Sequence, residues 1–223
     1  MKRKSNIAID GPAGAGKSTV AKMVAEKLSY LYIDTGAMYR ALTYCALKHS
    51  IDPKDGRQLR ELLDTISIIL KPTSSGTLVY VNETEVTEEI RSSEVTNTVS
   101  IVASHENVRL EMVKQQQKMA ENGGTVMDGR DIGTHVLPQA EVKVFLTASV
   151  EERAKRRHEE NIQKGFSSDL EQLKEEIARR DDLDSNREFA PLQQASDAVV
   201  IDSTHMSIPE VVENILHLVE ERF

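Results

Sequence analysis

The stretch NIAIDGPAGAGKSTVAKMVAEKL (residues 6–28) determines the fold expected for this chain. Its first five residues are typical of a short buried strand, a glycine-rich turn follows, and residues 17–28 have helical periodicity. Residues 11–18 match the pattern G-x-x-x-x-G-K-[ST] in full, in the strand, loop and helix context that this pattern requires. The stretch therefore predicts a loop that binds the phosphates of a nucleoside triphosphate; a plain glycine turn is the alternative.

The residue types of this loop indicate its chemistry. Glycines let successive backbone N–H groups curve around phosphate oxygens, and the N-terminus of the following helix adds a favourable dipole. We expect Lys17 to reach the β and γ phosphates and the Ser18 hydroxyl to be a ligand of Mg²⁺, the only metal that we expect. The predicted donor-binding residues are Gly11, Pro12, Ala13, Gly14, Ala15, Gly16, Lys17, Ser18 and Thr19.

Length and composition restrict the classes of protein. The chain has 223 residues, of which 39% are hydrophobic and 29% charged, enough for one substantial core. A net charge of -8 argues against binding to nucleic-acid polymers or anionic membranes, which relies on a broad basic surface. Cys45 is the only cysteine, so no intramolecular disulfide can form. Asp10 interrupts the apolar run that follows MKRK, too early for the hydrophobic region of a secretion signal. We expect a cytoplasmic monomer with no membrane-spanning segment.

Further strand-like runs alternate with helical sequence. They lie at residues 31–34, 124–128, 142–148 and 198–203, which favours an α/β fold with a mainly parallel sheet covered by helices on both faces. Residues 66–87 differ, because short β-rich runs separated by turn residues indicate a small antiparallel β insertion beside the main sheet. No internal repeat or long linker divides residues 1–223, so we expect a single domain.

Helix start signals accompany several of these segments. Thr35 is placed to cap the helix that follows the second strand. Three later pairs have capping-box spacing, namely Ser149 with Glu152, Ser168 with Glu171, and Ser207 with Glu210.

The segment LKEEIARRDDLDSNR (residues 173–187) begins as an ordinary amphipathic helix. Leu173 and Ile177 mark its inward stripe, but the same stripe continues through charged residues at 180, 184 and 187. One explanation is that the helix ends near Asp182 and that the rest is a solvated loop. The other is that these charges face a polar ligand.

The absence of other motifs narrows the possible uses of the triphosphate. A regulatory GTPase would carry D-x-x-G and N-K-x-D elements, and neither is present in this sequence. A motor ATPase would carry an acidic pair to activate water, but Asp128 has no adjacent glutamate. A small-molecule kinase fits better and requires an acceptor pocket. The polar residues expected around that pocket are Arg40, Arg130, Asp131, Arg180, Asp184 and Arg187.

The arginines of this set favour a phosphorylated acceptor, because a guanidinium binds phosphate in a forked geometry. The phosphate of a nucleoside monophosphate is largely a dianion at neutral pH and needs no general base. An alcohol acceptor would instead use an aspartate as the base, and Asp34, Asp128 or Asp131 could serve. A nucleotide-responsive binding protein without an acceptor is the alternative outside the enzymes.

Four motifs, in this order and spacing, resemble the bacterial cytidylate kinases, a family of P-loop nucleoside monophosphate kinases. They are IDGPAGAGKST (9–19), DTGAMYRAL (34–42), VMDGRDIGT (126–134) and RRDDLDSNR (179–187), and the similarity extends over nearly the whole chain. The resemblance implies a P-loop kinase domain over residues 1–223, with a subdomain for the monophosphate inserted at about 65–98. It further implies transfer of a phosphoryl group from ATP to CMP or dCMP with Mg²⁺.

The resemblance also assigns roles to individual residues. It implies that Arg40, Arg130 and Arg187 hold the acceptor phosphate, that Thr35, Arg180 and Asp184 lie at the sugar, and that Ser100, Arg109 and Asp131 read the cytosine. The role of Asp131 is chemically sensible, because a carboxylate accepts a hydrogen bond from the exocyclic amine of cytosine and would face the carbonyl of uracil unfavourably. Packing explains Ser100 equally well.

A short lid at about residues 153–166 is a further implication of the resemblance. Arg153, Arg156 and Arg157 have helical spacing there, so they share a face that could close over the donor phosphates. A solvated helix face paired with neighbouring glutamates is the alternative for each arginine. The residues expected to stabilise the transferring phosphoryl group are Lys17, Arg130, Arg157 and Arg187.

Overall fold

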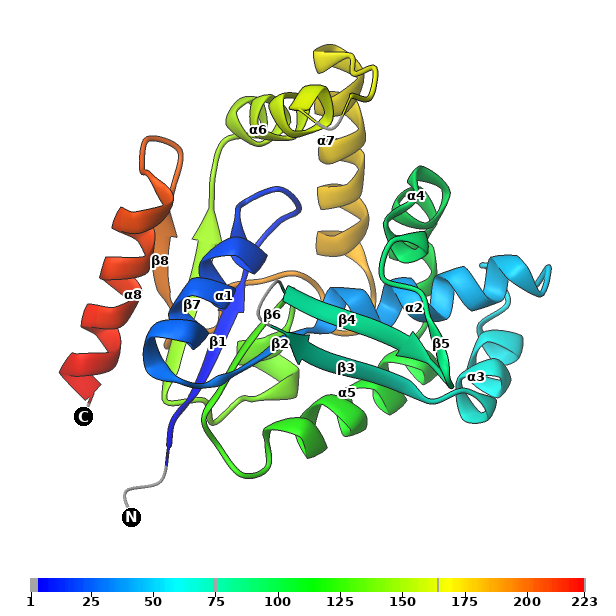
Figure 1. Cartoon of the computed structure of the whole chain (residues 1–223), viewed down its shortest axis with the longest axis horizontal. Helices are drawn as coiled ribbons and strands as arrows, with labels where there is room; N and C mark the ends of the chain where they lie inside the picture. The colour runs from blue at the N-terminus through cyan, green and yellow to red at the C-terminus, as the bar shows by residue number, and fades with distance from the viewer. Residues whose placement is uncertain (1–3, 74–75, 164, 223) are drawn as a thin grey trace.

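The computed structural model describes residues 4–73, 76–163 and 165–222. Within these ranges the main sheet has five parallel strands in the order β2-β6-β1-β7-β8 (Figure 1). The strands are β1 (Asn6–Asp10), β2 (Leu31–Asp34), β6 (Thr125–Gly129), β7 (Val142–Thr147) and β8 (Val199–Asp202). β2 and β6 lie on one side of β1, and β7 and β8, which follow later in the chain, lie on the other. In parallel sheets with such a change of side, ligand sites lie at the carboxyl ends of the strands.

Helices cover both faces of this sheet, as the strand sequences predict. On one face, Ile7 and Ile9 of β1 are fully buried in a cluster with residues of α1 (Lys17–Leu28) and α8 (Ile208–Arg222). On the other face, Ala8 packs with residues of α5 (Glu106–Ala120) and of the π-helical turn η2 (Ile132–Val136). Successive side chains of a strand point to opposite faces, so one short apolar run supplies two cores.

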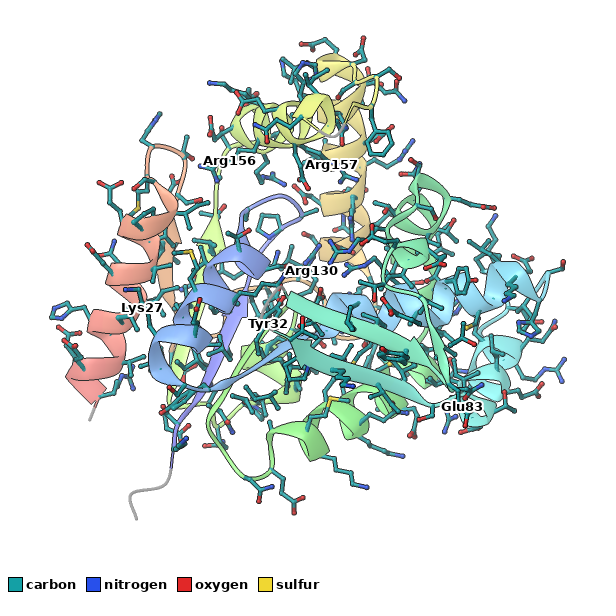
Figure 2. The ribbon with its side chains drawn as sticks, viewed as in Figure 1. Lys27, Tyr32, Glu83, Arg130, Arg156 and Arg157 are labelled. Carbon is teal, nitrogen blue, oxygen red and sulfur yellow. The ribbon has the colours of Figure 1, made fainter. Side chains whose placement is uncertain are left out.

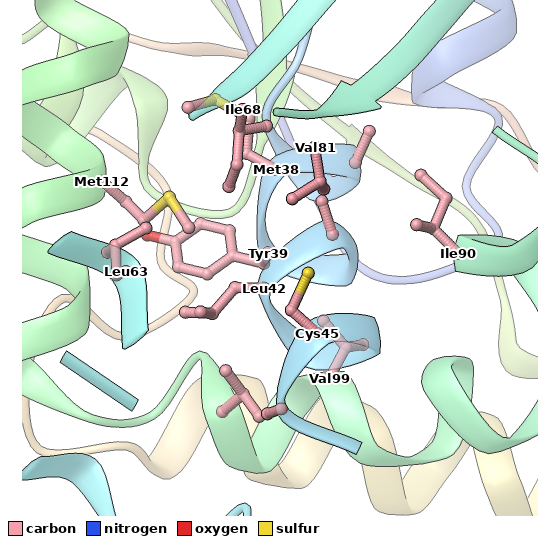
Figure 3. Close-up of a cluster of buried hydrophobic side chains, with 14 of the residues drawn as sticks. Met38, Tyr39, Leu42, Cys45, Leu63, Ile68, Val81, Ile90, Val99 and Met112 are labelled. Atoms are coloured by element: carbon pink, nitrogen blue, oxygen red, sulfur yellow. The ribbon is translucent and has the colours of Figure 1, made fainter. Parts of the chain in front are cut away.

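The predicted β insertion is confirmed as an antiparallel sheet of β3 (Ile68–Thr73), β4 (Gly76–Val81) and β5 (Thr84–Glu85). This small sheet packs into a hydrophobic core that is separate from the two cores of the main sheet. The other elements of that core are α2 (Thr35–Lys48), α3 (Gly56–Thr65), η1 (Glu89–Arg91), α4 (Ser93–Val102) and α5. Figure 3 shows Met38, Tyr39, Leu42 and Cys45 of α2 inside this core. The core holds α2 and α4 beside the carboxyl end of the main sheet.

The helices α6 (Val150–Gln163) and α7 (Leu170–Asn186) lie over the loop that follows β1 (Figure 1). They share a small cluster of three buried residues, Ala154, Leu173 and Ile177. Because α7 continues to Asn186, the explanation that it ends near Asp182 is wrong. Asp184 on the same stripe is only 4% exposed, so the charged part of the stripe faces inward.

Two of the predicted helix starts are wrong by one residue. Asp34, not Thr35, caps α2, because its carboxylate accepts the N–H of Ala37 at 2.8 Å and the Thr35 hydroxyl is used elsewhere. Asp169, not Ser168, caps α7 in the same way. An aspartate beside the predicted hydroxyl residue provides a charged acceptor, which suits the positive end of the helix dipole better.

Of the other two capping boxes, Ser207 with Glu210 is confirmed. At Ser149 only the serine half forms, because its N–H donates to Thr204 and the Glu152 carboxylate pairs with Arg156. The Ser149 hydroxyl accepts the N–H of Glu152 at 3.1 Å, and the Glu210 carboxylate accepts the N–H of Ser207 at 2.8 Å. Within the described ranges, no helix combines the length and the apolar character needed to cross a membrane.

Candidate active site

A cavity of about 1660 Å³ opens at the carboxyl end of the main sheet, between α2, α4, α6, α7 and the loop after β1. It brings together residues that are far apart in the sequence. The predicted residues that line it are Ala13, Gly14, Ala15, Gly16, Lys17, Ser18, Thr19, Asp34, Thr35, Arg40, Ser100, Arg109, Asp128, Arg130, Asp131, Arg153, Arg156, Arg157, Arg180, Asp184 and Arg187. Gly11 and Pro12 do not line it, but Gly11 is required below it because a Cβ there would overlap the carbonyl oxygen of Leu146.

Lys17 lies at the floor of this cavity, 6% exposed, and its Nζ donates to the carbonyl oxygen of Pro12 at 2.7 Å. Burial lowers the pKa of Lys17 well below its usual range, and the nearby Arg130 lowers it further. A bound polyphosphate would raise this pKa again, because it brings negative charge next to the buried ammonium group.

Asp128, at the end of β6, accepts hydrogen bonds from several elements. Its two carboxylate oxygens accept from the Ser18 and Tyr32 hydroxyls, each at 2.8 Å, and its backbone carbonyl accepts from Thr35 at 2.7 Å. Burial raises the pKa of Asp128, and the neighbouring Asp34 raises it further. The Ser18 hydroxyl donates its hydrogen to Asp128, so its lone pairs stay available to a metal ion. These groups therefore fit a divalent cation that arrives with a nucleotide.

Three arginines converge between this floor and α7. Arg40 pairs with Asp34 at 3.0 Å, and Arg130 pairs with Asp184 at 2.8 Å. Arg180 lies near both of these arginines; burial lowers its pKa to about 10, and the charge of Arg130 is the next cause. The Nε atoms of Arg40 and Arg180 are buried and have no hydrogen-bond partner among the described residues. Positive charge exceeds negative charge here, so the region fits an anion with several acceptor oxygens.

The cavity continues past these arginines to a buried pair, Arg109 and Asp131, which form an ion pair. Arg109 also donates to the carbonyl oxygen of Ala103 at 3.0 Å, and its guanidinium lies 5.3 Å from the ring centre of Tyr39. Arg187 approaches Asp131 at 3.8 Å, and burial lowers its pKa to about 10. This end of the cavity therefore presents fixed donors and acceptors at a depth where a planar base could be read.

The three arginines at the start of α6 do not share one environment. Arg153 is 3% exposed and bonds to protein groups on three sides, while Arg156 pairs with Glu152 and donates to the carbonyl oxygen of Ser203. Arg157 lines the cavity and makes no hydrogen bond or ion pair with the described residues. Figure 2 shows Arg156 and Arg157 on α6, with Arg130 in the centre of the view. All three arginines line the cavity, and Arg157 is the one that no other described residue holds in place.

The family model described as cytidylate kinase matches residues 7–221. The chain belongs to the cytidylate kinase family. A cytidylate kinase of Geobacillus kaustophilus is 65% identical over 222 residues, which cover 100% of this chain and 99% of that protein. A cytidylate kinase of Bacillus subtilis is 63% identical with the same coverage. Among solved structures, a gluconokinase of Sinorhizobium meliloti shares the fold at a TM-score of 0.50 and 15% identity, covering 100% of this chain and 95% of its own.

Sequence reasoning missed three side chains that support the site of this kinase. Tyr32 holds Asp128, Tyr39 lies against Arg109, and the buried Asp10 accepts the N–H groups of Ile132 and Gly133 at 2.8 and 2.7 Å. Asp10 thereby ties the end of β1 to the loop that carries Asp131. An aspartate that ends an apolar strand was the one available signal, since both tyrosines look like ordinary core residues.

Proposed function

We propose that this chain transfers the γ-phosphoryl group of ATP to CMP or dCMP, giving ADP and CDP or dCDP. Membership of the cytidylate kinase family supports the substrate class. The observation that carries the proposal is the convergence of Arg40, Arg130 and Arg180 beside the phosphate loop, with more positive than negative charge around them. A kinase that accepted an uncharged alcohol would not need this surplus.

The donor end of the cavity would hold ATP on the loop of residues 11–19. Backbone N–H groups and Lys17 would bind the phosphates, while Ser18, held by Asp128, would be a ligand of the accompanying Mg²⁺. Bound Mg²⁺ would neutralise charge on the donor phosphates.

The acceptor end would hold the monophosphate so that one phosphate oxygen attacks the γ-phosphorus in line with the departing ADP. Arg40, Arg130 and Arg187 would hold that phosphate, while Thr35, Arg180 and Asp184 would lie at the sugar. The attacking oxygen is already ionised at neutral pH, because the second pKa of such a phosphate is about 6, so no side chain has to remove a proton. Positioning and charge neutralisation by Lys17, Arg130, Arg157 and Arg187 would then supply the catalysis.

Recognition of the base would depend on Asp131 and Arg109, with Ser100 at the edge of the pocket. The Asp131 carboxylate can accept from the amine of cytosine, and Arg109 can donate to the ring nitrogen and carbonyl. Arg109 and Tyr39 would fix the carboxylate in place. Closure of residues 153–166 and of the insertion at about 65–98 would exclude water, which otherwise competes as the acceptor. A cytoplasmic monomer that does not bind nucleic-acid polymers stays a prediction.

An assay of ADP release tests this function. ATP and Mg²⁺ are supplied with CMP, dCMP, UMP, AMP, GMP or a sugar alcohol, and ADP formation is compared with the rate without acceptor. We expect strong stimulation by CMP and dCMP. Preferential stimulation by another monophosphate or by the alcohol would overturn the substrate assignment, and ATP binding without any stimulation would favour a nucleotide-responsive binding protein.

A further inference from the structure

Arg153 makes a set of contacts that the proposed function does not use. Its Nε donates to the carbonyl oxygen of Ala148 at 2.9 Å, and its Nη1 donates to that of Ala13 at 2.9 Å. Its Nη2 pairs with the Asp181 carboxylate at 2.7 Å. One guanidinium therefore joins the end of β7, the phosphate loop and α7 in three directions, and its fixed fork allows this where a lysine could not.

The bond to Ala13 restricts the orientation of the phosphate loop. In a trans peptide, the carbonyl of one residue and the N–H of the next point in opposite directions. A guanidinium that holds the Ala13 carbonyl therefore also directs the Gly14 N–H away from itself. Gly14 has a φ of +78°, and a Cβ on it would lie 3.2 Å from the Cβ of Arg153, so the two backbones are closely packed.

The bond to Asp181 connects this peptide to the acceptor side of the cavity. Asp181 lies on α7 next to Arg180 and one turn before Asp184, both of which line the cavity. The small cluster of Ala154, Leu173 and Ile177 is the buried apolar contact between α6 and α7. Because this apolar contact is small, even with the partly buried Val150 and Leu170 beside it, we expect a charged pair at the inner end of α6 to influence where α7 lies relative to the loop.

We propose that Arg153 is a positioning residue that, with Asp181, holds the phosphate loop and α7 in the relative placement needed for in-line transfer. We assign Arg153 to positioning because each of its three nitrogens bonds a protein group and the residue is only 3% exposed, although it lines the cavity and keeps two further N–H groups. The proposal has two parts. The acceptor arm, in which the Arg153–Asp181 pair places α7, rests on the proposed function. The donor arm, in which Arg153 holds the 13–14 peptide, concerns the phosphate loop alone.

Four variants test the two arms. Arg153→Lys keeps the charge but loses the fork, Asp181→Asn keeps the shape but loses the charge, and the double variant combines them. Asp182→Asn is the matched control, because Asp182 is the exposed neighbour of Asp181 on the same helix. Binding of a fluorescent, non-hydrolysable ATP analogue is measured without acceptor, and kcat and KM are measured with ATP and CMP.

We expect Asp181→Asn to lower kcat about tenfold while KM for CMP and binding of the analogue change less than about threefold, because alignment is lost and not affinity. Arg153→Lys should lower kcat similarly and also weaken analogue binding, because the 13–14 peptide is released. The double variant should have the kcat of Arg153→Lys alone, since both changes remove one connection. The control should behave as the wild type.

A kcat in Asp181→Asn equal to that of the wild type would overturn the proposal. A loss of kcat in the double variant equal to the product of the losses in the two single variants would do the same. So would equal losses in Asp181→Asn and Asp182→Asn, which would indicate a general effect of charge on α7. Melting temperatures identify any variant that is merely unfolded, and Asp181→Asn alone then decides. If no acceptor stimulates the wild type, the proposed function fails, while unaltered analogue binding in Arg153→Lys would separately refute the donor arm.

Discussion

Arg180 lies in a region with too little negative charge to balance the arginines around it. Arg40, Arg130 and Arg157 all disfavour its charge, while Asp184 favours it but also pairs with Arg130. Burial is the largest cause of the lowered pKa, which is about 10 and still leaves Arg180 charged at neutral pH. A bound nucleotide, with its phosphate on Arg40 and Arg130 and its sugar at Arg180, would supply the missing acceptors, so we expect this region to favour an anionic ligand.

At the same scale, Asp131 should set the choice of base. In Asp131→Asn the carboxylate acceptor is replaced by an amide that can also donate, and this removes its advantage for the cytosine amine over the uracil carbonyl. We expect the ratio of kcat/KM for CMP to that for UMP to narrow about tenfold or more. Steady-state kinetics with both nucleotides measure the ratio, and an unchanged value would count against Asp131 as the reader of the base.

Asp10 should make the stability of the protein depend on pH. Burial is the main cause that raises its pKa from 3.8 to about 7, so the folded protein binds this proton more tightly than the unfolded chain does. The contribution of Asp10 to the free energy of unfolding therefore falls as pH rises from about 4 to about 7 and is constant above.

Urea unfolding of the wild type and of Asp10→Asn at several pH values measures this effect. The asparagine variant is the neutral reference, although it also weakens the bonds to Ile132 and Gly133 at every pH. We expect the stability of the wild type relative to the variant to decrease between pH 4 and 7. A difference that does not vary with pH would contradict the prediction.

Among the elements, α7 shows how one helical stripe serves two purposes. Leu173 and Ile177 pack on α6, and one and two turns later the same stripe places Arg180 and Asp184 in the cavity. The helix holds these charges in register with its apolar anchor, because side chains three and four residues apart lie on the same face. The helix thus links the apolar anchor on α6 to the charged part of the cavity.

This arrangement predicts that Asp184→Ala weakens nucleotide handling more than folding. Without the carboxylate, Arg130 and Arg180 repel each other at the proposed sugar site, so we expect kcat/KM for CMP to fall about a hundredfold. The change faces a cavity that water can enter, so the loss in free energy of unfolding should be about 1–2 kcal/mol.

Kinetics with CMP and urea unfolding measure the two effects of Asp184→Ala, and Asp182→Ala on the exposed side of α7 is the control. A large loss of stability with little loss of kcat/KM would assign Asp184 to folding and contradict the prediction.

Across the whole molecule, separate cores surround the cavity. The main sheet has one core on each face, the insertion shares another with α2 and α4, and α6 and α7 share the smallest. The walls of the cavity are therefore not parts of one continuous apolar interior. A ligand that bridges them adds contacts that the ligand-free protein lacks, and its binding should stabilise the folded state.

We accordingly expect CMP to raise the melting temperature. At a concentration one hundred times its dissociation constant, a ligand adds about 2.7 kcal/mol of stability, which corresponds to about 5–10 °C for a chain of this size. Thermal denaturation followed with and without CMP measures the shift, and UMP at the same concentration should produce a smaller one. Equal shifts with both nucleotides would argue against selective recognition of cytosine.

Much of the fold and site could be read from local patterns. The phosphate loop, the alternation of strands and helices, the β insertion and the charged stripe on α7 are all recorded in short stretches, because backbone periodicity and turn chemistry act over a few residues. The same stretches name the arginines that line the cavity. They do not say which carboxylate each arginine meets.

The tertiary structure alone decided those pairings. Arg153 was grouped with the lid arginines by its spacing, yet it bonds Ala13, 140 positions away in the chain. Tyr32 meets Asp128 across 96 positions, and Asp10 meets Gly133 across 123. These partners depend on the order of the strands and on which loops meet at their carboxyl ends. Local residue patterns do not encode such long-range neighbours, so the supporting contacts of the site emerge only when the sheet is assembled.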